Sequence, residues 1–238
     1  MRVAIIYSGG MRSFERCLPN HRWIVHRHFP GAKFYVCTEL DEDAHKADLL
    51  EAATIKRVKQ PEMVIPPGCP TTWTPGQPYM HEPYHISVDP RAVLGQLWML
   101  RQAWALYEEA NDPADLIIRI RPDLWFHSFK MPELPNVLNL GDVAYVPWWG
   151  SFGPGCNDRF ALLGRSAARS YFTTYDRVSE SISNGAPLHP ETLIGLSLER
   201  FGLYFAKKLK AEFSTLRKTG EMRPPEITTI DLAHAAMR

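Results

Sequence analysis

The sequence predicts an α/β fold, a single domain whose mixed, mostly parallel central sheet is flanked by helices. Two observations support this prediction. The short apolar runs Val3–Tyr7 and Leu116–Ile120 are rich in β-branched residues, as is typical of strands buried on both faces. The segment Pro90–Tyr107, which precedes the second run, has apolar residues at helical spacing. An alternation of strand, helix and strand favours a sheet with parallel strands.

The first quarter of the chain adds further elements to this pattern. Apolar runs predict strands over Lys33–Thr38 and Thr54–Val58. A helix is expected over about Pro19–His28, with Trp23 packed against the core. A second helix is expected over about Glu39–Ala53, because acidic side chains suit the N-terminus of a helix.

The segments that flank the long helix complete the chain. Pro61–Pro90 has little periodicity but many aromatic residues, which favours an ordered flap near a site over disorder. Asp142–Pro147 is expected to be a strand, Ser166 to about Ile182 a helix, and Pro190 the first residue of another helix.

Composition excludes several classes of protein. A chain of 238 residues with 45% hydrophobic and 22% charged residues is ordinary for a soluble domain. A net charge of +1 gives no bulk electrostatic attraction to nucleic acids or membranes, and no apolar run approaches the ~20 residues that span a bilayer. The four cysteines form no C-x-x-C pair, and the first residues are too short an apolar stretch for a signal peptide. We therefore expect a cytoplasmic protein.

The central apolar run ends in a charged motif. Arg119, Arg121 and Asp123 lie where the strand must stop, because Pro122 cannot donate a hydrogen bond to the sheet. In open α/β sheets this end of a strand is where ligands bind. A salt bridge at the strand end is the structural alternative.

The first strand runs into a turn that suits phosphate. Ser8, Gly9 and Gly10 follow the strand directly, and Arg12 adds a permanent cation at the same place. Glycines allow the backbone to approach a ligand closely, and the following amides point at it. The turn is neither G-x-G-x-x-G nor a P-loop, so the pattern alone also fits simple turn chemistry.

Four short motifs, in order, carry a resemblance to a known family. They are Gly9-Gly10-Met11-Arg12-Ser13-Phe14, Arg119-Ile120-Arg121-Pro122-Asp123, Asn157-Asp158-Arg159-Phe160 and Pro190-Glu191. This set resembles the small nucleotide-sugar glycosyltransferases of GT-A fold found in bacterial and viral polysaccharide gene clusters. The match spans roughly residues 3–203, and the order and spacing of the motifs carry it.

The resemblance implies a nucleoside diphosphate sugar as donor and a hydroxyl acceptor on a glycan, lipid-linked glycan or other molecule. It implies a nucleotide-sugar-binding half over about residues 1–126, an acceptor-side half over about 127–205, and a C-terminal extension over 206–238. The residues that would hold the donor are Ser8, Gly9, Gly10, Arg12, Arg119, Arg121 and Asp123. A nucleic-acid acceptor is not favoured, given the near-neutral charge.

The family's Asp-x-Asp metal motif is incomplete here, because Arg121 stands where its first Asp would be. Asp123 could still bind Mn²⁺ or Mg²⁺, with His189 as a further ligand, or the arginines could neutralise the diphosphate directly. Asp158 and Glu191 are the candidates for the carboxylate that takes the acceptor proton. Whether the reaction inverts or retains the sugar configuration stays open.

Two other functions remain. The incomplete metal motif leaves room for a non-catalytic nucleotide- or glycan-binding module of the same fold. A metal-dependent phosphoesterase using Asp123 and Asp158 would need further ligands, and no H-x-D, D-x-H or G-x-H cluster is present. The aromatic loop with Trp148 and Trp149 could stack on sugar faces or pack in the core.

Overall fold

The computed structural model describes residues 1–69, 89–135, 140–147, 149, 155–200 and 207–223. Its main feature is a seven-stranded sheet. In spatial order the strands are β3 (Thr54–Val58), β2 (Lys33–Glu39), β1 (Val3–Ser8), β4 (Leu116–Ile120), β7 (Phe160–Gly164), β6 (Ala144–Pro147) and β8 (Lys207–Leu209). The neighbours from β3 to β4 pair in parallel, β7 is antiparallel to both β4 and β6, and β8 is parallel to β6. The prediction of a mixed, mostly parallel sheet is confirmed.

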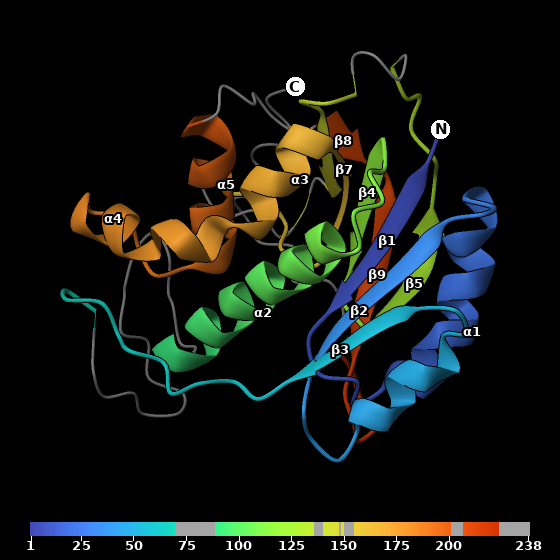
Figure 1. Ribbon diagram of the computed structural model, residues 1–238, viewed down its shortest axis with the longest axis horizontal. Helices are drawn as coiled ribbons and strands as arrows, with labels where there is room; N and C mark the ends of the chain where they lie inside the picture. Colours follow the sequence, from blue (N-terminus) through green and yellow to red (C-terminus); the bar gives the residue numbers. More distant parts are fainter. Residues whose placement is uncertain (70–88, 136–139, 148, 150–154, 201–206, 224–238) are drawn as a thin grey trace.

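A second, three-stranded sheet lies beside the first (Figure 1). It joins β5 (Leu124–Phe129) to β9 (Ala211–Leu216) and β9 to β10 (Met222–Arg223), each pair antiparallel. No strand was predicted over β9, whose partner β5 lies almost 90 residues earlier in the chain. The segment 207–223 is therefore built into both sheets.

Helices cover both faces of the main sheet (Figure 1). The helices are α1 (Phe14–Ile24), α2 (Pro90–Glu109), α3 (Arg165–Phe172), α4 (Val178–Ser183) and α5 (Pro190–Arg200), with short 3-10 turns at η1 (His26–His28), η2 (Ala44–Leu49) and η4 (Thr174–Arg177). Helix α2 lies across β1, β2 and β3, whereas α1 packs on β5 on the other side. No helix within the described ranges is long and apolar enough to cross a membrane.

The alternation of side chains along the strands builds two separate cores. Ala4 and Ile6 of β1 face α2, and Ile5 and Tyr7 face α1 and the small sheet. The predicted apolar stripe of α2 is confirmed as core, because its members are all at most 3% exposed: Val93, Leu97, Leu100, Trp104 and Tyr107. Both faces of β1 are thus buried, as the continuous apolar run predicted.

Helix α1 differs from its prediction. It begins at Phe14 rather than near Pro19, and the proline lies inside it. The start is fixed by the turn that precedes it, where the Phe14 amide donates to the Met11 carbonyl (3.0 Å). Trp23 lies in solvent, 68% exposed, against the expected core position, and His21 is completely buried.

Two other predicted helices are broken up. In the acidic segment the Asp43 amide donates to Asp41 Oδ1 (3.0 Å), and this local turn leaves only the 3-10 turn η2 in place of a helix. The expected helix over 166–182 is divided into α3, η4 and α4. At the break the Thr173 and Thr174 hydroxyls donate to the carbonyls of Arg169 and Ser170, and such side-chain bonds compete with the helical pattern.

The fold brings three strand ends and one hairpin to the same edge. Because β1, β2 and β4 are parallel, their carboxyl ends meet at this edge. The end of β9 joins them, since the Leu216 amide donates to the Asp123 carbonyl (2.8 Å). The following residues 217–223 form the turn and the short strand β10.

Candidate functional site

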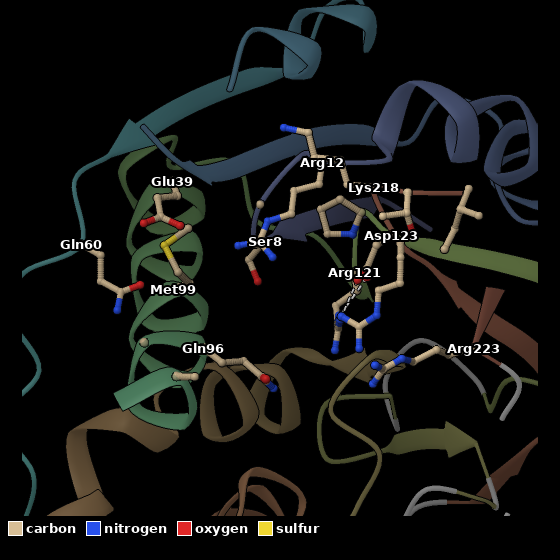
Figure 2. A pocket seen from close by; sticks show the side chains of 18 of the residues that line it. Ser8, Arg12, Glu39, Gln60, Gln96, Met99, Arg121, Asp123, Lys218 and Arg223 are labelled. Atoms are coloured by element: carbon tan, nitrogen blue, oxygen red, sulfur yellow. Dashed lines mark hydrogen bonds and ion pairs between the residues drawn. The ribbon is translucent and has the colours of Figure 1, made fainter. Parts of the chain in front are cut away.

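A cavity of about 730 Å³ opens at this edge of the sheet (Figure 2). All seven residues that the sequence assigned to donor binding line it: Ser8, Gly9, Gly10, Arg12, Arg119, Arg121 and Asp123. Helix α2 contributes Ala92, Gly95, Gln96 and Met99, and the segment after β9 contributes Arg217, Lys218, Thr219, Glu221 and Arg223. Groups far apart in the sequence therefore share one cavity.

The turn after β1 has the backbone that the sequence indicated. Gly9 adopts φ +121°, which side chains other than hydrogen rarely permit, and its amide donates to the Cys37 carbonyl (3.2 Å) at the end of β2. A Cβ at this position would lie 3.7 Å from Pro122, so the turn also packs against the R-x-R-P-D motif. Ser8 is 1% exposed, and its Oγ has no hydrogen-bond partner in the described part of the chain.

Arg121 and Asp123 form a two-pronged ion pair. Arg121 Nε donates to Asp123 Oδ1 (3.0 Å) and Nη2 to Oδ2 (2.6 Å), with about a fifth of each side chain exposed. Burial alone would raise the pKa of Asp123, but the charge and hydrogen bonds of Arg121 outweigh it and lower that pKa. Burial likewise opposes the charge of Arg121, and Asp123 raises the pKa of Arg121 overall. Both groups are charged at neutral pH.

Arg119 is a buried cation within β4. It is 1% exposed, and burial lowers its pKa to about 10. Its Nη1 donates to the carbonyl of Ile120, whereas its Nε has no hydrogen-bond partner in the described residues. A buried guanidinium with unsatisfied donors is costly unless an anion or an ordered water completes it.

The cavity is strongly cationic although the whole chain is nearly neutral. Its lining contains six cationic side chains, Arg12, Arg119, Arg121, Arg217, Lys218 and Arg223, against three acidic ones, Glu39, Asp123 and Glu221. A cleft lined with one sign of charge concentrates ligands of the opposite sign. The arrangement suits a small anionic ligand such as a diphosphate.

The predicted catalytic carboxylates lie behind the cavity wall rather than in it. Asp158 and Glu191 are 2% and 5% exposed, and neither lines the cavity. Gln96, which does line it, donates through Nε2 to Asp158 Oδ2. Burial raises the pKa of Glu191 well above its usual value, and the negative charge of Asp158 raises it further. The two carboxyl groups therefore belong to one buried cluster.

His189 belongs to the same cluster. Its Nε2 lies 3.1 Å from Glu191 Oε2, its Nδ1 lies 3.1 Å from Thr192 Oγ1, and burial lowers its pKa to about 4. The sequence placed His189 with Asp123 as metal ligands. Within the described part of the chain, no group of three or more His, Cys, Asp or Glu side chains could hold a metal ion. Asp123 already directs both carboxylate oxygens at Arg121, so these residues do not form a metal site by themselves.

Several lining residues were missed by sequence reasoning. Glu39 was expected at the N-terminus of a helix, yet it is the last residue of β2 and lines the cavity. The available signal was its position at the end of a predicted parallel strand. The residues after β9 carried no local signal beyond a strand–turn pattern around Gly220. Trp149, considered for sugar stacking, is 1% exposed and donates to the Ala211 carbonyl (2.9 Å), so it is core. Trp148 and most of the expected flap lie outside the described residues.

Proteins similar to this chain are found among solved structures. No family model matches the chain, and no curated protein matches it. Two crystal structures of the glycosyltransferase GlyE of Streptococcus pneumoniae TIGR4 are similar, one of them the apo form, with 11% sequence identity in both cases. The TM-scores are 0.46 for the apo form and 0.43 for the other, covering 87% and 83% of this chain but only 45% and 43% of GlyE. The chain spans less than half the length of these GlyE chains, and the chemistry of the site rests on its own residues.

Proposed function

We propose that the chain is a glycosyltransferase that moves a sugar from a nucleoside diphosphate donor to an acceptor hydroxyl. The observation that carries the proposal is that the seven residues assigned to donor binding from the sequence line one cationic cavity. Four lie at the end of β1 and on the turn that follows it, and three lie at the end of β4 or just after it, more than 100 residues later. If each of these residues had only a structural role, the seven would not need to line one cavity.

The diphosphate occupies the space between the turn and the strand end. The backbone of Gly9 and Gly10 approaches it closely, because neither residue has a side chain in the way. Arg12, on the exposed side, and Arg119, on the buried side, contribute positive charge. Charge develops on the leaving diphosphate as the sugar–phosphate bond breaks, and fixed cations stabilise that charge.

Asp123 orients Arg121 in this proposal. The ion pair uses Arg121 Nε and one Nη2 hydrogen, which leaves Nη1 free to meet a phosphate oxygen from a fixed direction. A divalent metal, Mn²⁺ or Mg²⁺, would provide the same charge stabilisation by a different route. Among the described residues no group of three or more His, Cys, Asp or Glu side chains could hold such an ion, so we assign the diphosphate to the arginines.

Asp158 remains our candidate for the group that takes the acceptor proton, with Glu191 as the second. Asp158 is separated from the cavity by Gln96, so contact with an acceptor requires the Gln96 side chain to turn aside. Burial and the charge of Asp158 raise the pKa of Glu191, which favours its protonated form, so we rank it second.

The proposal is tested by ligand-induced stabilisation. UDP, GDP, CDP, ADP and dTDP and their common sugar conjugates are added to the full chain with and without Mn²⁺, and the melting temperature is recorded. One nucleotide should raise it, because a ligand that binds only the folded state stabilises that state. A shift that needs no metal supports the arginines, and a shift only with Mn²⁺ supports a metal held by Asp123. The matching sugar nucleotide should then be hydrolysed slowly without an acceptor.

A matched pair of variants makes the test specific. Arg12→Gln should weaken nucleotide binding about tenfold, the size of one lost charge-assisted hydrogen bond. Arg27→Gln, at an exposed arginine that stacks on Trp23 instead, should leave it unchanged. Nucleotide binding without hydrolysis or transfer would favour the binding module, and turnover of a generic phosphate ester without any nucleotide would favour the phosphoesterase. The absence of any nucleotide-dependent shift would overturn the donor site.

A further inference from the structure

The hairpin after β9, residues 216–223, is held firmly beside the proposed diphosphate site. Ser13 Oγ, just after the glycine turn, donates to the Leu216 carbonyl (2.7 Å) in a buried hydrogen bond. The Leu216 amide donates to the Asp123 carbonyl, and the Arg217 amide to the Glu221 carbonyl (2.8 Å each). The hairpin is thus attached to both motifs that build the donor site.

Two of its cations have no acidic partner in the described residues. Lys218 is engaged, because its Nζ lies 3.1 Å from Asp43 Oδ2 and also pairs with Glu42. Arg217 and Arg223 form no ion pair with the described residues, and the buried Arg217 Nε has no hydrogen-bond partner among them. Burial lowers the pKa of Arg217, and the charges of Arg223 and Arg121 lower it further, with Asp123 and Glu221 opposing.

Arg223 lies toward one end of the cavity. Figure 2 shows Arg121 and Asp123 in the middle, with Arg223 on one side and Glu39 and Gln60 on the opposite side. A ligand that places its diphosphate at Arg12 and Arg121 would still leave the Arg223 end uncovered. That end is cationic.

The charge balance points the same way. The cavity lining has three more cationic than acidic side chains. A nucleoside diphosphate sugar carries one negative charge on each phosphate, so the lining keeps a net positive charge when the donor is bound. With the diphosphate assigned to Arg12, Arg119 and Arg121, the lining cations that still form no ion pair with the described residues are Arg217 and Arg223. A buried or half-buried cation is stabilised by a ligand that pairs with it and brings hydrogen-bond acceptors.

We infer that Arg217 and Arg223 form a second anion subsite, which takes a carboxylate or phosphate carried by a sugar. The inference rests on the proposed function for the orientation of the ligand, and it narrows the substrate class to acidic sugars. The charged group belongs either to the transferred sugar or to the acceptor. Both sources present the same chemistry to the two guanidinium groups.

The test compares an acidic sugar with its neutral counterpart. Glucuronate and glucose are titrated into the full chain, with and without saturating pyrophosphate, and binding is followed by calorimetry or by the melting temperature. Wild type should bind glucuronate about tenfold more tightly than glucose, the value of a charge-assisted hydrogen bond. The variant Arg217→Gln/Arg223→Gln should bind both sugars equally. If the double variant does not fold, Arg223→Gln at its exposed position decides by the same comparison.

Arg16→Gln is the control, because the Arg16 guanidinium lies against Gly220 of the hairpin but does not line the cavity. It should keep the preference for glucuronate. The inference would be overturned if the wild-type protein bound the acidic sugar and its neutral counterpart equally in all of these experiments. It would also be overturned if the folded double variant still preferred the acidic sugar. The affinity for pyrophosphate tests the diphosphate site separately. If Arg12→Gln leaves that affinity unchanged, the proposed function is contradicted, whereas the comparison of glucuronate with glucose can still be interpreted.

The source of the acidic group follows from a second pair of probes. UDP-glucuronate and UDP-glucose, or the conjugates of whichever nucleotide binds, are compared in the same way. A preference seen only in the sugar nucleotide assigns the subsite to the transferred sugar. A preference seen with the free sugar assigns it to the acceptor.

Discussion

Arg121 and Asp123 face each other across Pro122, with the guanidinium joined to both carboxylate oxygens at 3.0 and 2.6 Å. The proline ends β4 and keeps the two residues outside the sheet, so the pair forms at the cavity rather than within the core. The first of the two charged positions is thus a cation, and both oxygens of the Asp123 carboxylate are directed at it.

A double-mutant cycle on Arg121 and Asp123 should reveal strong coupling. Arg121→Gln, Asp123→Asn and the double variant should give a coupling energy of about 1–3 kcal/mol in urea unfolding, because the pair is bidentate and mostly shielded from water. Asp123→Asn should also abolish sugar-nucleotide hydrolysis while the chain stays folded. Full turnover in Asp123→Asn would contradict its place in the site.

The pair Arg57 and Asp48 is a matched control for this cycle. It has the same residue types and contacts of 2.6 Å, but it lies outside the cavity lining and the Asp48 side chain is 61% exposed. Its coupling should stay below about 1 kcal/mol, as for surface ion pairs. Removing it should leave nucleotide binding unchanged.

Gly9→Ala should damage both stability and nucleotide binding. At φ +121° an alanine is strained by about 1–3 kcal/mol, and relief of that strain would move the backbone of the turn that lines the cavity. Gly31→Ala provides the comparison, because Gly31 also has a positive φ (+78°) with open space around it, away from the cavity. Thermal unfolding should show a loss in both variants, whereas a titration with the nucleotide should show weakening only for Gly9→Ala. Equal affinity in the two variants would remove the turn from the donor site.

The sequence predicted the parallel half of the fold well, because each of its elements carries a local signal. Buried parallel strands such as Leu116–Ile120 read as continuous apolar runs, and the stripe of α2 repeats at helical spacing. That the residues after β1 and β4 line one cavity was predictable for the same reason. They follow these strands directly, and the carboxyl ends of parallel strands meet at one edge.

The other half of the site depends on pairings that leave no local trace. Strand β9 is recognisable only through β5, almost 90 residues away, and a charged turn such as Arg217–Glu221 reads as an ordinary solvated loop. Burial of His21 has the same origin. Tyr7 Oη and the Leu124 carbonyl meet its two ring nitrogens (3.0 and 2.5 Å), and neither partner is apparent from the residues next to the histidine. Such compensation arises only from the tertiary structure.

Glu191→Gln should stabilise the protein, and the gain should grow with pH. Because the pKa of Glu191 is raised in the folded state, that state favours the protonated carboxyl. The contribution of this group to stability is therefore fully present below its usual pKa of 4.5, and it is lost as the pH rises toward the folded pKa. Glutamine resembles the protonated form and avoids the loss. The difference between variant and wild type should be near zero at pH 4 and rise above pH 5 by up to about 1.4 kcal/mol per pH unit. A difference that does not change between pH 4 and 8 would show that Glu191 is not held protonated.

Ser13→Ala should loosen the hairpin without touching the cavity. Ser13 is 1% exposed and its hydroxyl is the donor that satisfies the Leu216 carbonyl, so its removal leaves a buried acceptor unpaired, at a cost of about 1–3 kcal/mol. Ser183→Ala, which removes an exposed hydroxyl bonded to the Ser179 carbonyl within α4, should cost less than about 0.5 kcal/mol. Amide hydrogen exchange should show faster opening around Leu216 in the first variant only, and the preference for glucuronate over glucose should weaken with it. If exchange at Leu216 stays as slow as in wild type, the hairpin is held by the Asp123 carbonyl alone, and the serine that follows the glycine turn has no part in positioning it.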